Sequence, residues 1–353
     1  MLETPAMETD LAAESLLLNT AQSGDRMVAV GERGHIIYSD DFGQTWIQAE
    51  VPVRATLTGV YFPTPEKGWA VGHGGVILHS SDRGETWVKQ LDGFEGQKKI
   101  IAYLEKQIEK KKAELEAAED PDERADLRFE LEDIEFTLED AMADAEAGPW
   151  QPLMDVWFAD EKRGLAVGSY GMIFLTTDGG KTWKNHMGAI NNPRRFNFNA
   201  ISQTADGALF LAVEAGIVHR STDKGETWVE VQTPYDGSFF GVVGTSKPDQ
   251  ILAFGLRGNI YRSENLGDDW SQIDTDIDRT INSGNVGDNG DIVLVANDGA
   301  ILRSTDDGKT FTTYTRPSRQ SFVDVLVMEG KGLLLVGEGG AVLTDGSGRD
   351  FTP

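Results

Sequence analysis

The side chains that most often carry out chemistry in proteins show no catalytic spacing in this sequence. No two histidines lie four residues apart, and no histidine has metal-ligand spacing. The five histidines are His35, His73, His79, His186 and His219. With no cysteine, a thiolate nucleophile, a thiolate metal site and a disulfide framework are excluded. No G-x-S-x-G, P-loop or dinucleotide-binding pattern occurs. We therefore expect a non-enzymatic protein with no metal and no cofactor.

The charge balance narrows the possible partners. The 353 residues include 58 acidic and 32 basic side chains, a formal charge of −26. Nucleic acids and anionic membranes are bound by basic surfaces, so neither is an expected partner. No apolar run reaches the ~18 residues of a membrane span. The 40 glycines indicate many tight turns.

One octapeptide recurs every 40–45 residues, with a single longer step. Its form is Ser/Thr-x-Asp-x-Gly-x-Thr-Trp, as from Ser39 to Trp46. Its third positions are Asp41, Asp82, Asp178, Asp223, Asn265 and Asp306. Its aromatic positions are Trp46, Trp87, Trp183, Trp228, Trp270 and Phe311. We expect the Asp to accept turn amides, the Gly to adopt positive φ and the Trp to pack between repeats. A calcium or catalytic site would not recur six times at equal spacing.

Each period also reads as four short strands separated by glycine-containing turns. Leu57–Phe62, Gly68–Gly72, Val76–Ser80 and Thr86–Gln90 are one such set. Four strands per unit at this period indicate propeller blades, and a decayed seventh box ends at Phe351. The expected fold is an all-β, seven-bladed propeller. Its fourth strand in the last blade would be only residues 349–353, so part of residues 1–13 should pair there or stay loose.

Residues 95–147 interrupt the repeats and change composition. They hold 18 acidic and 8 basic residues and no tryptophan. Apolar and small residues follow alternating steps of three and four, with Lys111 in one seam place, which is typical of a coiled-coil seam. One series is Ile101, Leu104, Ile108, Leu115 and Ala118, and the other is Leu127, Leu131, Ile134, Leu138 and Ala141. Asp120 and Pro121 predict the start of a second helix, so we expect an antiparallel hairpin standing on the face opposite the boxes. Phe129, Phe136 and Tyr103 lie off the seam and would need a second surface.

Arginines recur just before the first strand of several blades. Arg54, Arg195, Arg279 and Arg319 share one phase of the repeat, where Trp150 and Asp236 occupy the other places. Arginine forks suit carboxylates and phosphates, although pairing with neighbouring acids remains an alternative. The predicted binding residues, around the channel mouth on the hairpin side, are Arg54, Arg195, Arg279, Arg319, Arg194, Arg33, Arg257, Trp150, Tyr170 and His73.

The octapeptides resemble Asp-boxes, also called BNR repeats. An apolar-Ala-Val-Gly-x-x-Gly-x-Ile run precedes them at 28–36, 69–77 and 165–173. With these runs, the sequence is similar to the photosystem II stability/assembly factor-like family of Asp-box propellers, in its bacterial non-photosynthetic branch. The resemblance implies an assembly or accessory role. It covers nearly the whole chain except the insertion.

The resulting hypothesis is a non-catalytic protein-binding scaffold for a membrane or envelope protein complex, monomeric in isolation and without a membrane span. The alternative is a sialidase-like Asp-box glycoside hydrolase, although no F-R-I-P segment is present. The expected organisation is an N-terminal segment 1–13, blades 1–2 over 14–94, the hairpin over 95–147 and blades 3–7 over 148–353. A periplasmic or exported location is expected, with the signal peptide missing before Met1, and a cytoplasmic location stays open.

Overall fold

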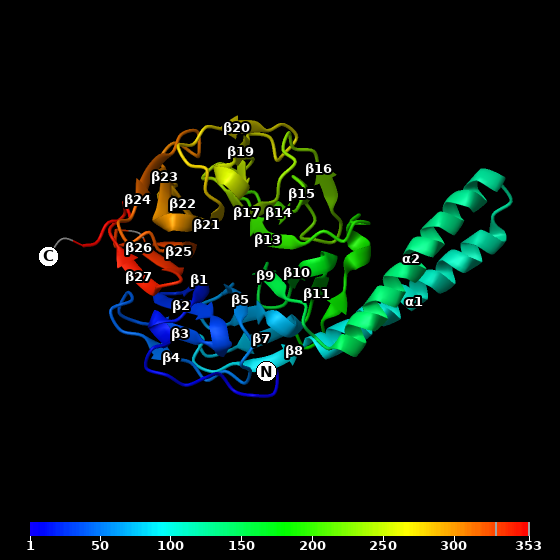
Figure 1. Ribbon diagram of the computed structural model, residues 1–353, viewed down its shortest axis with the longest axis horizontal. Coiled ribbons are helices and arrows are strands. Elements are labelled where there is room, and N and C mark those ends of the chain that lie inside the picture. The colour runs from blue at the N-terminus through cyan, green and yellow to red at the C-terminus, as the bar shows by residue number, and fades with distance from the viewer. Residues whose placement is uncertain (329, 352–353) are drawn as a thin grey trace.

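Seven antiparallel sheets surround a central channel in the computed structural model, which describes residues 1–328 and 330–351 (Figure 1). Blade 1 contains β1 (Leu17–Ser23), β2 (Arg26–Gly31), β3 (Ile36–Ser39) and β4 (Ile47–Gln48). Blade 2 contains β5 (Leu57–Tyr61), β6 (Gly68–Gly72), β7 (Val76–Ser80) and β8 (Val88–Leu91). Blade 3 contains β9 (Leu153–Phe158), β10 (Gly164–Gly168), β11 (Ile173–Thr176) and β12 (Lys184–Asn185). Blade 4 contains β13 (Phe198–Gln203), β14 (Leu209–Val213), β15 (Val218–Ser221) and β16 (Val229–Val231).

The remaining blades complete the ring. Blade 5 contains β17 (Phe239–Gly244), β18 (Ile251–Gly255), β19 (Ile260–Ser263) and β20 (Ser271–Ile273). Blade 6 contains β21 (Ile281–Val286), β22 (Ile292–Ala296), β23 (Ala300–Ser304) and β24 (Thr312–Thr315). In the described residues blade 7 has three strands, β25 (Phe322–Met328), β26 (Gly332–Gly337) and β27 (Gly340–Thr344). The predicted seven-bladed propeller is confirmed. Of the fourth strand expected at 349–353, residues 352–353 lie outside the described residues.

The hydrophobic core is divided among the seams between blades. Seven clusters of buried residues each join two neighbouring blades, because a single sheet cannot bury both of its faces. The box aromatic of one blade packs against the preceding blade. Trp87 lies with Val28 of blade 1, Trp183 with Trp69 of blade 2, and Trp228 with Leu165 of blade 3.

The Asp-box is a hydrogen-bonded staple within its turn, as expected. Asp41 accepts the Thr45 amide at 2.9 Å and the Thr45 hydroxyl at 2.6 Å, while the Gly43 amide donates to Ser39 Oγ at 2.7 Å. These bonds, above all that from the Thr45 hydroxyl, lower the pKa of Asp41 to about 2. The same bonds to the box aspartate recur at Asp82, Asp178, Asp223 and Asp306.

Two boxes form their turns with different hydrogen bonds. In blade 5 the Asn265 side chain accepts the Asp269 amide and donates to the Asp269 carboxylate, at 2.9 and 3.0 Å. In blade 7 Asp345 accepts the Arg349 amide at 3.0 Å. The carboxylate therefore stands one residue before its expected place at Gly346.

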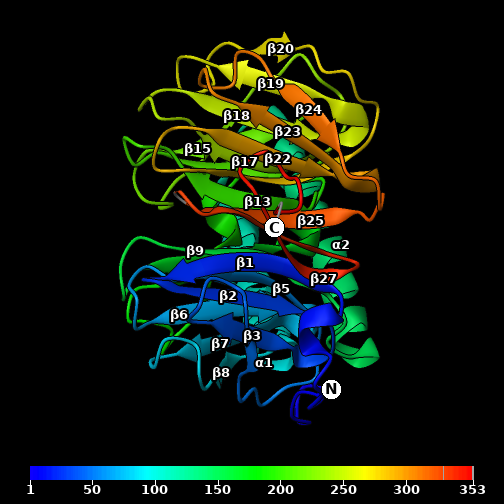
Figure 2. The ribbon, with the colours of Figure 1, turned by 90° about the vertical axis from the view of Figure 1, so that its left-hand side faces the viewer.

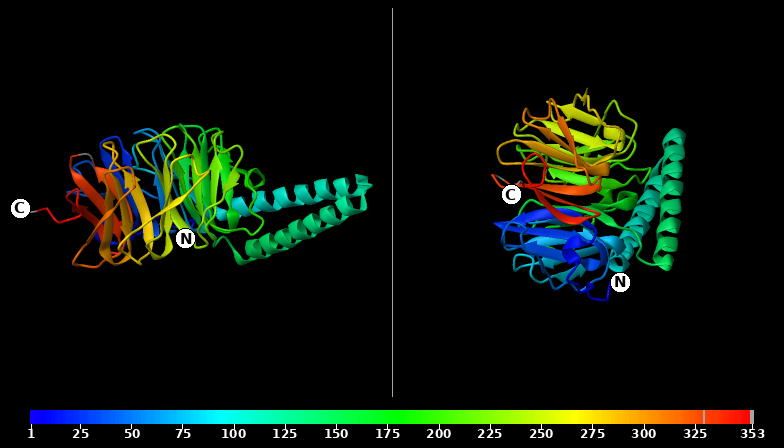
Figure 3. Two further views of the ribbon diagram at one scale, coloured as in Figure 1. Left: turned by 90° about the horizontal axis from the view of Figure 1, so that it is seen from above. Right: turned by 60° about the vertical axis from the view of Figure 1, so that its left-hand side comes forward.

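The insertion is a helical hairpin whose direction differs from the prediction. Helices α1 (Gly93–Ala117) and α2 (Pro121–Ala147) are capped by Asp92 and Asp120, so the first helix begins two residues before the expected boundary. The root of α1 contacts β12 and the turn after β6. Packed against these outer elements, the hairpin extends outward from the rim beside blade 3 instead of standing over the face (Figures 1 and 3). Neither helix of the described chain is long and apolar enough to cross a membrane.

Residues 1–13 neither form a strand of the last blade nor stay loose. The Ala6 amide donates to Val51 O and the Arg54 amide to Met1 O, which holds the segment along blades 1 and 2. Leu2 is buried there. The segment then reaches blade 7 as a short 3-10 helix, Ala12–Glu14, packed against β27.

The innermost strand of every blade has a β-bulge, and in six of the seven blades it positions a side chain that bonds to the next blade beside the channel. At three seams the bulged residue donates to a carbonyl of the next blade. These bonds are Thr58 to Leu153 O, Asn199 to Phe239 O and Asn282 to Phe322 O, at 2.7, 2.7 and 2.6 Å. At three others the next residue accepts an amide of the following blade. These bonds are Val60 N to Asn19, Ile201 N to Asp155 and Thr20 N to Asp324, at 2.9, 2.9 and 2.7 Å.

Asp324 closes the ring between its two ends, where β25 lies beside β1 (Figure 2). One carboxylate oxygen accepts from the Thr20 amide, the Thr20 hydroxyl at 2.9 Å and the Asn19 amide group at 3.0 Å. The other accepts from the Ser283 hydroxyl at 2.5 Å. One side chain thus joins blades 6, 7 and 1 without any exchange of strands among the described residues.

Replacement of Asp324 by Ala should destabilise the protein by about 3 kcal/mol, because it leaves several buried donors without an acceptor. Urea unfolding measures the change. The control is Asp278→Ala, which removes an exposed carboxylate of the blade 5–6 loop. An equal loss of stability in the two variants would contradict the closing role of Asp324.

The buried carboxyl of Asp155 should make stability depend on pH. Burial raises its pKa from 3.8 to about 7, so the folded protein holds a proton there that the unfolded chain releases above pH 4. Stability from this group therefore falls as pH rises from about 4 to 7. Burial also lowers the pKa of His219 to about 4, which acts in the opposite direction over part of this range.

The comparison of wild type with Asp155→Asn isolates the carboxyl. We expect wild type to lose stability relative to the variant as pH rises from 4 to 7 in urea unfolding. A difference between the two proteins that is the same at each pH would show that Asp155 does not titrate in this range.

Candidate functional site

The predicted binding residues lie on the face made by the turns between second and third strands and by the connections between blades. In six of these turns one residue has a φ between 55° and 71°, and all of these residues but the buried Gly74 are exposed. These residues are Arg33, Gly74, Tyr170, Ala215, Arg257 and Asp298. The turn packs tightly on the connection leaving its own blade. A Cβ on Gly216 would lie 1.9 Å from Tyr235 O, and one on Gly258 would lie 2.2 Å from Ile277 O.

Three predicted residues come together beside the root of the hairpin. The rings of Trp150 and Tyr170 meet edge to face with centroids 5.5 Å apart, and both rings are exposed, at 47% and 40%. The Arg195 guanidinium lies 5.7 Å from the Tyr170 centroid and forms an ion pair of 2.9 Å with Asp140 of α2. Asn197 accepts the Tyr170 amide at 2.8 Å and fixes the turn. We call Trp150, Tyr170 and Arg195 the aromatic cluster.

Two of the other predicted residues, Arg54 and Arg33, contact the N-terminal segment 1–13. Arg54 donates to Pro5 O at 3.1 Å, and its own amide is bound to Met1. Arg33 lies 3.7 Å from Glu32 and contacts the Met7 sulfur. His73 is exposed in the turn of blade 2. These residues line the part of the face that residues 1–13 cross.

A second group of arginines lies on blades 5 and 6. Arg279 forms an ion pair of 3.1 Å with Asp298, and Arg319 lies beside the same turn, its Cα 3.2 Å from a Cβ built on Gly299. Arg257 projects from the turn of blade 5. Arg257 and Arg319 are exposed. Arg194 is also exposed and lies over the Phe196 ring, in the connection that leads into blade 4.

The pairing register of the first strands corrects the repeat phase that grouped the four arginines. Ser283 of blade 6 pairs as Gly59 and Asp324 do in their blades, so the equivalent place five residues earlier is Asp278. Arg279 is one residue out of phase. Three of the six equivalent places hold arginine, and local acids neutralise two of the four predicted ones, Arg195 and Arg279. The sequence pattern alone did not show which residue of this strand pairs with the second strand.

The central channel is the second candidate site. It encloses about 470 Å³ and is lined by polar groups that include Asn19, Tyr61, Asp155, Ser283 and Asp324. Burial raises the pKa of both aspartates, and their charges repel. Their oxygens accept the bonds between blades described above, and Asp155 also accepts the Val156 amide of its own strand. Within residues 1–328 and 330–351, no three His, Asp or Glu side chains gather as a metal site.

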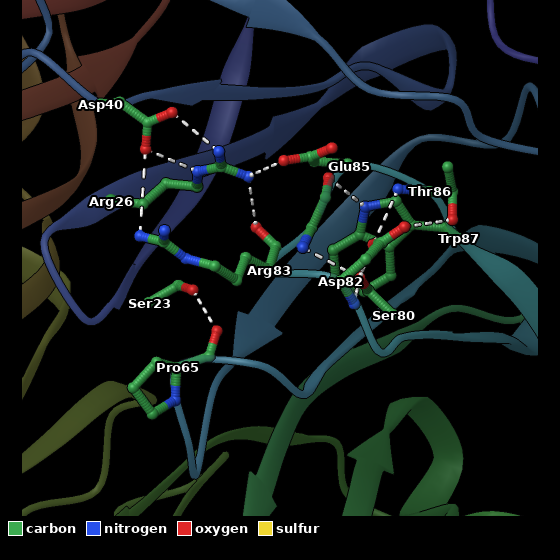
Figure 4. Close-up of polar contacts among 11 residues, drawn as sticks. Ser23, Arg26, Asp40, Pro65, Ser80, Asp82, Arg83, Glu85, Thr86 and Trp87 are labelled. Carbon is green, nitrogen blue, oxygen red and sulfur yellow. Dashed lines mark hydrogen bonds and ion pairs between the residues drawn. The ribbon is translucent and has the colours of Figure 1, made fainter.

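On the Asp-box face, ion pairs join neighbouring blades. The repeat pattern of the boxes did not predict them. Buried Arg26 of blade 1 forms a fork with Asp40, at 2.8 and 2.7 Å, and reaches the box of blade 2 (Figure 4). There it donates at 3.1 Å both to Arg83 O and to Glu85. Arg163 and Arg220 contact the corresponding carbonyl and acid of the next box, and Arg262 contacts the carbonyl. The only sequence signal is an acid at the sixth box position. These arginines join neighbouring blades, and their contacts on the Asp-box face are with the protein's own residues.

Comparisons with known proteins agree with this architecture. The family model of the photosynthesis system II assembly factor YCF48 matches residues 145–351. Photosystem II assembly lipoprotein Ycf48 of Synechococcus sp. (strain CC9902) is 27% identical over 218 residues, which cover 58% of this chain and 65% of that protein. The chain thus matches just under two thirds of the length of its curated relative.

Solved structures show the same fold. A structure of YCF48 bound to D1 peptide superposes with a TM-score of 0.63 at 15% identity, covering 97% of this chain and 100% of that one. YCF48 from Cyanidioschyzon merolae superposes with a TM-score of 0.62 at 15% identity, covering 93% and 95%. Because the family model spans more than half of the sequence, the chain belongs to the photosystem II assembly factor YCF48 family of Asp-box propellers.

Proposed function

We propose that this protein is a non-catalytic scaffold that binds a protein segment during assembly of a membrane or envelope complex. Family membership supports an accessory role. A relative is named as a photosystem II assembly lipoprotein, and the solved structure of a similar propeller is of YCF48 bound to a D1 peptide. The name lipoprotein also supports a periplasmic or exported location for this chain.

The aromatic cluster is the observation that carries the proposal. Two exposed aromatic rings held edge to face present a large apolar surface with little conformational freedom left to lose on binding. Beside them, Arg195 offers a guanidinium whose partner Asp140 is half exposed, with 46% of its side chain accessible. A carboxylate of a bound segment can share or replace that partner, since arginine binds carboxylates through two parallel donors.

The exposed arginines of blades 5 and 6 complement this cluster. Arg257 and Arg319 lie on the same face as the aromatic cluster, and the protein as a whole is strongly acidic. Exposed charges of this kind act mainly on the association rate and on its salt dependence. The expected ligand is therefore a segment with an apolar anchor and a nearby carboxylate.

Loss of the two aromatic rings should weaken partner binding by about tenfold or more, as expected for central anchors of an interface. The variant is Trp150→Ala/Tyr170→Ala, and the measurement is the yield of crosslinked partners recovered from cells and quantified by mass spectrometry. Arg257→Ala/Arg319→Ala should reduce recovery mainly at low salt. Arg128→Ala on the hairpin is the control for loss of an exposed arginine. Recovery equal to wild type in both double variants would sink the proposal.

A glycoside hydrolase is the second candidate, favoured by the two buried carboxyls of the channel. A general acid with a pKa near neutrality suits glycoside hydrolysis. Because Asp155 and Asp324 are held by bonds between blades, we expect no turnover of aryl glycosides or sialosides. Turnover that disappears in Asp155→Asn would favour the hydrolase over the scaffold.

A further inference from the structure

The distal half of the hairpin packs only on its own partner helix, away from the propeller (Figures 1 and 3). Near the ring, Ile100, Leu104 and Ala141 are buried in the seam cluster of blades 2 and 3. Farther out, Ile108 and Leu131 are buried between the helices. The 27 residues of α2 span about 40 Å at ~1.5 Å per residue. The distal part of this arm is therefore free to meet another molecule.

Contacts within the hairpin use the cations of α1. Lys111 pairs with Glu130 at 2.7 Å and Lys112 with Glu135 at 2.8 Å across the two helices. Arg124 of α2 donates to two carbonyls at the end of α1, Leu115 O and Ala118 O, both at 2.8 Å. The other cation of α2 is Arg128, which is exposed and precedes Phe129 in the sequence. This helix has eleven acidic and two basic residues, a net charge of −9.

Two phenylalanines lie on the outward side of α2. Phe129 and Phe136 are seven residues apart, which places them on one face of α2, and they are 75% and 62% exposed. Exposed acids flank them: Asp122, Asp126, Glu132, Asp133 and Glu139. The seam of the hairpin does not need either ring. We call Phe129, Phe136 and these five acids the acidic stripe.

We propose that the acidic stripe is a docking surface for a basic amphipathic segment of a partner protein. An apolar side of that segment covers the two rings, and its lysines or arginines meet the flanking acids. The charge of α2 disfavours the other occupants. A second copy would bring −9 against −9, and an anionic membrane surface would be repelled. The surface is separate from the aromatic cluster and rests on the proposed function only in that the partner is a protein.

The test uses defined probes and the full chain. The probes are an 18-residue amphipathic peptide of Lys and Leu, the same peptide with Glu for Lys, and phosphatidylglycerol vesicles. Fluorescence anisotropy measures binding to wild type, to Phe129→Ser/Phe136→Ser and to the matched control Val88→Ser/Val229→Ser. The control removes two exposed apolar side chains of the propeller, 59% and 53% accessible. Circular dichroism verifies that the helices persist, as expected because both rings are exposed.

We expect wild type to bind the Lys/Leu peptide with an affinity that falls as salt rises. The double phenylalanine variant should lose at least tenfold and the control less than twofold, while the Glu/Leu peptide and the vesicles do not bind. Equal affinity of the phenylalanine variant and wild type would overturn the proposal, as would binding of the Glu/Leu peptide or vesicles, or self-association that the variant abolishes. Trp150→Ala/Tyr170→Ala should bind the Lys/Leu peptide as wild type does. This arm of the test separates the stripe from the proposed function, which depends on the aromatic cluster.

Discussion

The hydrogen bonds between innermost strands are the constraint on which the ring depends, because each blade buries its faces only against its neighbours. A bulge lies at the same place in every first strand, and in all blades but the fifth it turns one or two polar side chains toward the next blade. At the seam between the chain ends, a single carboxylate accepts four donors from blades 1 and 6. Buried polar groups in such a network fix one arrangement, since any other leaves donors without partners. The polar groups that line the channel thus serve mainly to join neighbouring blades by hydrogen bonds.

Features decided within a few residues were predictable from the sequence. The Asp-box needs only bonds within its own turn, so its spacing alone indicated both the role of Asp41 and the number of blades. The cap at Asp120 is equally local. The arginines that join boxes to preceding blades were missed because their partners lie 45 to 63 residues away. Nothing in the periodicity distinguishes Arg26 from an exposed strand residue.

The candidate binding face was located from repeat phase, but its details depended on geometry that phase does not record. The pairing register makes Ser283, and not Gly284, the equivalent of Gly59, so Arg279 was placed with residues that are not its equivalents. The hairpin was expected on the same face because of where it is connected. Its direction follows instead from packing of α1 on the outer strand of blade 3. The sequence predicted only that the residues of the aromatic cluster lie on one face. The contact between the rings of Trp150 and Tyr170 depends on the left-handed backbone conformation of Tyr170 in its turn.

Completion of blade 1 from consecutive residues has a consequence for how the chain folds as it is synthesised. Propellers that close by exchanging a strand must wait for their last residues before the first blade is whole. Here β1 to β4 need no distant segment, so blades can add in order from the N-terminus, each on the exposed side of the one before. The final step is different in kind. Until Asp324 arrives with the first strand of blade 7, the growing structure is an open arc with the inner edge of blade 1 unsealed.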